Sequence, residues 1–256
     1  MEFTVAGMVH LPPLPGAPGF DGDRAALRTR ALADAETLVA GGVDALVIEN
    51  FGDAPFYPDS VPKHVVADMT ALVGAVTDAV DVPVGVNVLR NDAAAAVSIA
   101  AATGAAFVRV NVHTGVRLTD QGIVEGQAHE TLRLRDRLDA DVDILADVAV
   151  KHSAPLAVRP LTEEARETLE RGRADGLVVS GAGTGERTDR SALERVAPVC
   201  AAADAPLVVG SGVTPETVAE SLDVADAVIV GTAFKRGGEV TNPVAESRVR
   251  ELVERI

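Results

Sequence analysis

The chain has 256 residues, and 47% of them are hydrophobic, so it is long enough to bury a large core. Aromatic residues make up only 3% and tryptophan is absent, so that core is built mainly from Val, Ala, Leu and Ile. The formal net charge of −15 and the lack of any basic stripe argue against a nucleic-acid-binding protein.

The predicted elements alternate regularly along the chain. Eight short apolar runs are predicted strands, at residues 3–8, 45–50, 84–89, 107–110, 144–148, 177–180, 207–209 and 227–230. Helices are predicted at about 24–40 and 64–79 and then from about residues 92, 128, 162, 189, 214 and 242, whereas residues 116–127 are predicted as a long connection. This α/β pattern predicts a single (β/α)8 TIM-type barrel that spans residues 1–256 as one domain, because such barrels have about 250 residues.

The predicted location is the cytoplasm. The apolar runs fall far short of the ~20 residues of a membrane helix, so no membrane insertion is expected. The chain begins directly with a strand and shows no signal peptide, and its single cysteine, Cys200, excludes an internal disulfide. The excess of acids, the many alanines and the presence of only three lysines favour a halophilic protein over an ordinary acidic cytosolic one, since molar salt screens charge within ~3 Å.

Glycine-rich turns follow the seventh and eighth predicted strands. They contain Gly210, Ser211 and Gly212 after the first, and Gly231 and Thr232 after the second. Glycine leaves backbone N–H groups unshielded, and the helix start expected behind the first turn favours an anion. Because the loops after strands seven and eight commonly bind phosphate in these barrels, these five residues are predicted to bind a small phosphorylated ligand. Alternatively, the glycines only make tight turns.

A third glycine-rich loop, residues 181–185, follows the sixth predicted strand. Gly183 is predicted to extend the phosphate-binding rim, and the hydroxyls of Thr184, Ser211 and Thr232 are candidate donors. The alternative is a lid without a ligand.

Several stretches together resemble the BtpA family, which includes the SgcQ-type proteins. They are residues 7–16, 49–53, 87–92, 109–115 and 147–152, and the resemblance spans essentially the whole chain. It implies a TIM-type barrel. The family takes its name from a factor needed for photosystem I accumulation, so the resemblance also implies, as one alternative, a non-catalytic assembly or biogenesis factor of the photosystem I type.

Candidate catalytic residues lie where barrels keep their active sites, at or after the C-terminal ends of strands. Glu49 and Asp147 are expected to face one pocket, where one could act as a general base and the other could orient substrate hydroxyls. Arg109, one layer deeper, is expected to pair with one of them in a structural ion pair. His113 could join the carboxylates in binding a divalent metal, but no spacing is diagnostic, so no metal ligands are assigned and no cofactor is firmly implied.

Lys151 is the fourth catalytic candidate, because a desolvated lysine can form a Schiff base. Its predicted place in a loop favours phosphate binding, or pairing with an acid, over that role. The candidate substrate-binding residues from the strand ends are Asn50, Asn87, Arg90 and Asn111.

The sequence therefore predicts an enzyme acting on a small phosphorylated metabolite, a sugar phosphate or a nucleoside-derived compound. Lyase, isomerase and nucleosidase chemistry all fit carboxylates opposite an anion site. The alternatives are the assembly factor named above and a ligand sensor. The protein could form a homo-oligomer with any of these functions.

Overall fold

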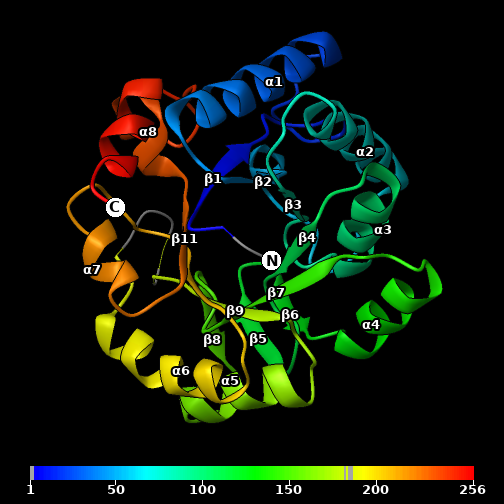
Figure 1. Ribbon diagram of the computed structural model, residues 1–256. Coiled ribbons are helices and arrows are strands. Elements are labelled where there is room, and N and C mark those ends of the chain that lie inside the picture. The colour runs from blue at the N-terminus through cyan, green and yellow to red at the C-terminus, as the bar shows by residue number, and fades with distance from the viewer. Residues whose placement is uncertain (1–2, 182, 184–186) are drawn as a thin grey trace.

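The structure is a computed structural model that describes residues 3–181, 183 and 187–256. Its centre is a closed barrel of eight parallel strands surrounded by helices (Figure 1). The strands are β1 (Val5–His10), β2 (Ala45–Glu49), β3 (Val84–Asn87), β4 (Phe107–Val110), β7 (Asp143–Val148), β9 (Gly176–Val179), β10 (Leu207–Val209) and β11 (Ala227–Val230). They pair in chain order, and β11 closes the barrel against β1. The predicted (β/α)8 barrel is confirmed.

The helices lie outside the barrel. They are α1 (Arg24–Gly41), α2 (Lys63–Thr77), α3 (Ala93–Thr103), α4 (Ala128–Arg137), α5 (Leu161–Glu170), α6 (Arg190–Ala202), α7 (Val218–Leu222) and α8 (Glu246–Val253), with short 3-10 turns η1 (Phe51–Asp53), η2 (Thr232–Phe234) and η3 (Arg236–Gly238). Aspartate side chains cap three of them by accepting backbone N–H groups: Asp23 at α1, Asp92 at α3 and Asp189 at α6. The described part of the chain contains no helix that is long and apolar enough to cross a membrane.

Strand alternation separates two layers of the core. Outward side chains such as Val9 and Ile48 pack with the helices, whereas inward ones such as Met8, Val47 and Leu145 fill the barrel. The next inward positions towards the C-terminal end are polar in several strands, among them Asp147 on β7. The barrel interior therefore changes from apolar to polar at the end where the βα loops begin.

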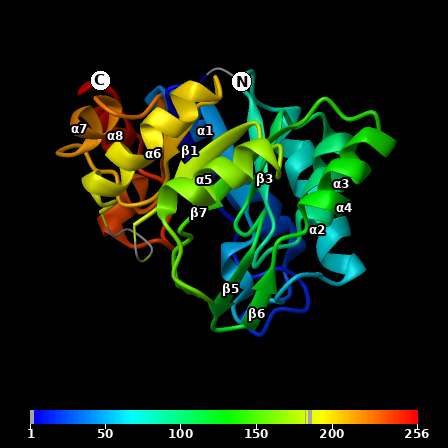
Figure 2. The same ribbon diagram turned by 90° about the horizontal axis from the view of Figure 1, so that it is seen from below.

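A three-stranded antiparallel sheet, in the order β6-β5-β8, stands beside this end of the barrel. It consists of β5 (Val116–Thr119), β6 (Gly122–Glu125) and β8 (Ser153–Pro155). Figure 2 shows β5 and β6 projecting beyond the barrel. Residues 116–127, predicted only as a long connection, do link β4 to α4, but a two-residue turn folds them into a hairpin that the sequence did not predict. The extra sheet joins the loops that follow β4 and β7.

Candidate functional site

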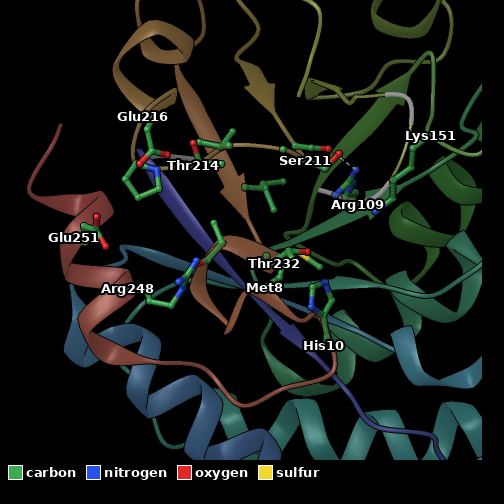
Figure 3. Close-up of a pocket in the computed structure, with 18 residues that line it drawn as sticks. Met8, His10, Arg109, Lys151, Ser211, Thr214, Glu216, Thr232, Arg248 and Glu251 are labelled. Carbon is green, nitrogen blue, oxygen red and sulfur yellow. Dashed lines mark hydrogen bonds between the residues drawn. The ribbon is translucent and has the colours of Figure 1, made fainter. Parts of the chain in front are cut away.

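A cavity of about 360 Å³ opens at the C-terminal ends of β1, β10 and β11 (Figure 3). Arg109 and Lys151 lie at one side of it, and Arg248 and Glu251 of α8 lie at the other. The remaining lining residues are Met8, His10, the loop Gly210 to Glu216, Ile229, Gly231, Thr232, Ala233 and Gly238. The cavity therefore has cationic groups at two places and backbone loops between them.

The loop after β10 supplies free backbone donors. Among the described residues, the N–H groups of Ser211, Gly212 and Val213 donate to no acceptor, although all three residues line the cavity. Gly212 has a φ of +76°, in the left-handed region that favours glycine. Successive free N–H groups of this kind form a concave site for an anion. The helix expected directly behind the loop begins later, at Val218, and has only five residues, so the loop itself supplies the donors.

The loop after β11 lies against His10 and α8. A Cβ at Gly231 would come within 2.8 Å of His10 Cε1, so the close approach of this loop to the His10 ring requires glycine at position 231. On the other side, Nε of the half-buried Arg248 donates to the carbonyl of Ala233 at 2.7 Å. This bond holds one edge of the Arg248 guanidinium and fixes its position at the cavity wall. The site thus gains a positioned cation from the last helix of the chain.

Arg109, at one side of the cavity, belongs to a buried ion pair. Its Nε and Nη2 donate to the two oxygens of Asp147 at 2.9 and 3.0 Å, and Nη2 also reaches Ser180 Oγ at 3.2 Å and Gly210 O at 3.3 Å. Burial alone would lower the pKa of Arg109, but the charge and hydrogen bonds of Asp147, with a further contribution from Glu49, raise it. Arg109 therefore stays charged at the base of the loop after β10.

Two asparagines orient this ion pair. Asn111 Nδ2 donates to Asp147 Oδ2 at 3.0 Å, and Asn87 Nδ2 donates to Asn111 Oδ1 at 3.2 Å and to the carbonyl of Arg109 at 2.9 Å. A chain of hydrogen bonds therefore runs from β3 to β10. Each member fixes the next, which preorganises the guanidinium.

His10 and Glu49 form a second buried polar pair. His10 Nε2 lies 3.8 Å from Glu49 Oε1, and within the described residues neither Glu49 Oε1 nor His10 Nδ1 has a hydrogen-bond partner. Burial lowers the pKa of His10 well below 6.5, and the positive charges of Lys235, Lys151 and Arg109 add to this shift. The His10 ring is therefore neutral at pH 7, and its buried Nδ1 has no hydrogen-bond partner among the described residues.

The structure brings together only some of the residues predicted from the sequence. Lys151, Gly210, Ser211, Gly212, Gly231 and Thr232 line the cavity, whereas Glu49, Asp147, Asn87 and Asn111 are buried beside it and do not line it. Gly183 contributes a carbonyl that accepts from Ser211 Oγ at 3.3 Å. Thr184 lies outside the described residues.

Asn50 and Arg90 hold loops. Asn50 Oδ1 accepts from the N–H of Leu89 at 2.7 Å, and its Nδ2 donates to Asp53 Oδ2 at 3.0 Å, which ties the loops after β2 and β3 together. Arg90 Nη2 donates to the carbonyl of Lys151 at 2.6 Å. Both residues are buried and act through the backbone they position.

His113 belongs to another part of the surface. Its Nε2 lies 2.8 Å from the carbonyl of Gly172, and its side chain borders a groove between α4 and the C-terminal end of α5. It is therefore separate from the cavity. Over the described part of the chain, no group of three or more His, Cys, Asp or Glu side chains is placed to hold a metal ion.

Sequence reasoning did not identify Arg248 or Ser180 as site residues. Arg248 lies on a helix that carries three other charged residues, Glu246, Arg250 and Glu251, so its spacing gives no signal. Ser180 directly follows β9, at a strand end where the sequence drew attention to the glycines instead. A search for polar residues at every strand end would have found Ser180.

The fold and the cavity define a class, the (β/α)8 barrels with a polar site at the C-terminal ends of their strands. The chain belongs to the BtpA family, whose model matches residues 1–256. It is 45% identical over 250 residues to the photosystem I biogenesis protein BtpA of Synechocystis, which covers 98% of this chain and 86% of that protein. It is also 46% identical over 251 residues to an uncharacterized protein of Thermococcus kodakarensis, with 97% and 93% covered.

Solved structures share the fold at low sequence identity. Thiamine phosphate pyrophosphorylase from Pyrococcus furiosus aligns with a TM-score of 0.60 at 16% identity, over 99% of this chain and 95% of that one. Phosphoribosyl anthranilate isomerase from Thermus thermophilus aligns with a TM-score of 0.59 at 14% identity, over 98% and 97%. Both are similar to this chain in their barrel architecture.

Proposed function

We propose that the protein is an enzyme that acts on a small phosphorylated metabolite. The phosphate is bound by the loops after β10 and β11, between the free N–H groups of residues 211–213 and the guanidinium of Arg248. The observation that carries this proposal is the placement of these donors on one cavity with Arg109, Lys151 and His10. Two structural neighbours are named as enzymes of phosphorylated compounds, which agrees with such a ligand.

The cavity has separate places for binding and for chemistry. A phosphate held near Arg248 fixes one end of the substrate, so that its other end lies beside Lys151 and the neutral His10 (Figure 3). Holding a substrate against a reacting group in this way raises its effective concentration. Glu49 and Asp147 do not line the cavity but influence residues that do. Glu49 lies beside His10, and Asp147 pairs with Arg109.

Calorimetry with inorganic phosphate and a panel of sugar phosphates and nucleotides tests the proposal. The Arg248→Met variant should weaken binding about 10- to 100-fold, because a hydrogen bond to a charged group contributes about 1.5–3 kcal/mol. Arg250→Met is the matched control, since Arg250 lies on the same helix and does not line the cavity. If no phosphorylated compound binds the parent, or if both variants bind like the parent, the proposal fails.

A second candidate function is a non-catalytic role in assembly, as the name of the Synechocystis relative suggests. It is favoured by apolar side chains exposed on and beside the extra sheet, where Leu118 is 42%, Ile123 57% and Leu156 57% exposed. This role would survive Arg248→Met and would be lost when these apolar side chains are replaced by polar ones. A ligand sensor, the third alternative, would keep phosphate binding without any turnover.

A further inference from the structure

Lys151 differs from the other lysines of the chain. Lys63 is exposed at the start of α2, and Lys235 is fully buried with its Nζ paired to Asp34 at 3.2 Å. Lys151 is only 9% exposed and lines the cavity, yet among the described residues its Nζ makes no hydrogen bond and no ion pair. A buried ammonium without a partner is costly, so this position favours the neutral amine.

The backbone around Lys151 is held in an unusual conformation. Ala149 and His152, on either side of it, have φ values of 54° and 53°, in the left-handed region. Ser153 Oγ donates to the carbonyl of Val150 at 2.6 Å, and Arg90 donates to the carbonyl of Lys151 itself at 2.6 Å. Strained residues persist where the surroundings over-determine them, and they cluster at functional sites.

Arg90 is the clearest sign that the position of Lys151 matters. Its side chain is buried, and within the described residues no carboxylate lies within ion-pair distance of it. The one side-chain hydrogen bond that the structure records for Arg90 goes to the Lys151 backbone. A buried guanidinium is thus used to fix one loop residue, which makes Arg90 a positioning residue for the amine.

The charges around Lys151 act in both directions. Burial lowers the pKa of Lys151 below its ordinary value of 10.5. Glu49 and Asp147 oppose this shift, whereas Arg109 and Arg90 reinforce it. A lowered pKa raises the fraction of unprotonated amine near neutral pH, and only this form is a nucleophile.

We propose that Lys151 forms a Schiff base with the carbonyl group of a phosphorylated aldehyde or ketone. This inference rests on the proposed function, since the phosphate of that substrate occupies the loops after β10 and β11. The substrate class is thereby narrowed from phosphorylated metabolites in general to those with a reactive carbonyl group on a carbon that does not carry the phosphate.

The reaction balances with groups that line the cavity. The lone pair of Lys151 Nζ forms a bond to the carbonyl carbon while the C–O π bond breaks, and a proton moves from nitrogen to oxygen to give a carbinolamine. A second proton on that oxygen lets it leave as water, and the nitrogen lone pair forms the protonated C=N bond. The neutral imidazole of His10, which lines the cavity, relays these protons: one moves from the nitrogen to the oxygen, and the second comes from solvent.

The protonated imine then acts as an electron sink. It withdraws electrons from the neighbouring carbon, so that a C–H or C–C bond there breaks more easily. Its positive charge stands where Glu49 and Asp147 favour a cation at Lys151. Of the reaction types compatible with the sequence, this chemistry fits the lyase and the isomerase.

Borohydride trapping tests the inference, because it reduces an imine to a stable secondary amine. The parent is incubated with dihydroxyacetone phosphate, glyceraldehyde 3-phosphate or ribose 5-phosphate, reduced, and analysed by intact mass and peptide mapping. We expect one adduct, at Lys151, which inorganic phosphate competes away. The small number of lysines makes the assignment unambiguous.

Two variants separate amine chemistry from charge. Lys151→Arg keeps a long basic side chain and loses the nucleophilic amine, so it should form no adduct, although the loops after β10 and β11 still bind phosphate. Lys63→Arg, at an exposed site, should be trapped like the parent. Should Lys151→Arg fail to fold, peptide mapping of the parent and its competition by phosphate still decide the question.

The remaining outcomes distinguish failure of the Schiff base alone from failure of the proposed function. If phosphorylated carbonyl compounds bind the parent but no adduct forms, or if the adduct lies only on Lys63 or the N-terminus, the Schiff base is excluded and the proposed function stands. If no phosphorylated compound binds the parent at all, the proposed function fails and the Schiff base fails with it.

Discussion

The buried pair of Arg109 and Asp147 gives the sharpest stability prediction. Asp147 accepts two hydrogen bonds from Arg109 and one from Asn111, and its side chain has no exposed surface. Asp147→Asn is nearly isosteric, but it removes the negative charge and replaces one acceptor with an NH2 group that faces other donors. The Arg109 guanidinium would then be buried without a counter-charge.

The expected cost follows from this geometry. Breaking a buried pair by removing one partner costs about 3–5 kcal/mol, because it leaves an uncompensated buried charge. For a chain of 256 residues, an unfolding entropy of roughly 2.1 cal/mol/K per residue gives roughly 540 cal/mol/K in total. Dividing the cost by this entropy predicts a fall in melting temperature of about 6–9 °C.

The chain offers a matched control. Arg24 binds Asp68 through the same two atoms, Nε and Nη2, at 2.8 and 3.3 Å, but the Arg24 side chain is 64% exposed. Asp68→Asn should cost at most about 1 kcal/mol, which is about 2 °C on the same scale. Calorimetric melts of the two variants decide the matter. If Asp147→Asn melts no lower than Asp68→Asn, the buried charge does not carry the predicted cost.

Three further predictions concern binding, pH and salt. Gly212→Val should abolish phosphate binding, whereas Gly104→Val, at a glycine with a similar φ of +72° remote from the cavity, should leave it intact; equal losses would point to backbone strain alone. The pKa of His10 in the folded chain lies below 6.5. When the pH falls below 6.5, His10 therefore takes up a proton in the unfolded chain but not in the folded chain. This uptake favours the unfolded chain, so the folded state loses stability at acid pH. His10→Gln should therefore lose less stability than the parent in denaturant titrations from about pH 7 to about pH 5, and His129→Gln, at an exposed site, is the control; a parent-like loss in His10→Gln would contradict the assignment. Finally, the net charge of −15 predicts a melting temperature that falls as salt is lowered from molar to physiological levels, and a salt-independent melting temperature would refute the halophilic interpretation.

Periodicity explains why the barrel could be predicted and the extra sheet was not. The eight barrel strands are mainly apolar runs bounded by turns, which is the pattern of strands buried on both faces. In the hairpin only β5 alternates, with Arg117 between Val116 and Leu118, whereas Ile123 and Val124 are adjacent in β6, and each strand has four residues. Alternation over so few residues is a weak signal, and β8 pairs with β5 across a sequence separation that no local pattern reveals.

The site was predictable only as far as strand alternation reaches. Residues two apart on a strand face the same side, so the inward-facing Leu145 predicts that Asp147 also faces inward. In the structure, Asp147 forms a bidentate ion pair with Arg109. Strand alternation could not show that Arg109 lines the cavity whereas Asp147 lies behind Arg109 and does not line it. Arg248 depends on how α8 packs against the loop after β11, which is a tertiary contact without a local sequence signature.

The energetic costs at the barrel mouth bear on the choice between an enzyme and an assembly factor. The chain buries Arg90, places the buried Lys151 between two strained residues, and leaves Glu49 Oε1 without a partner among the described residues. Apolar residues of similar volume would stabilise a barrel that only presents an outer surface, because replacing buried charges in this way is often neutral or stabilising. Such costs are expected where a ligand completes the network, since binding sites trade stability for function. The cavity, rather than the exposed sheet, is therefore the first place to test for the activity of this protein.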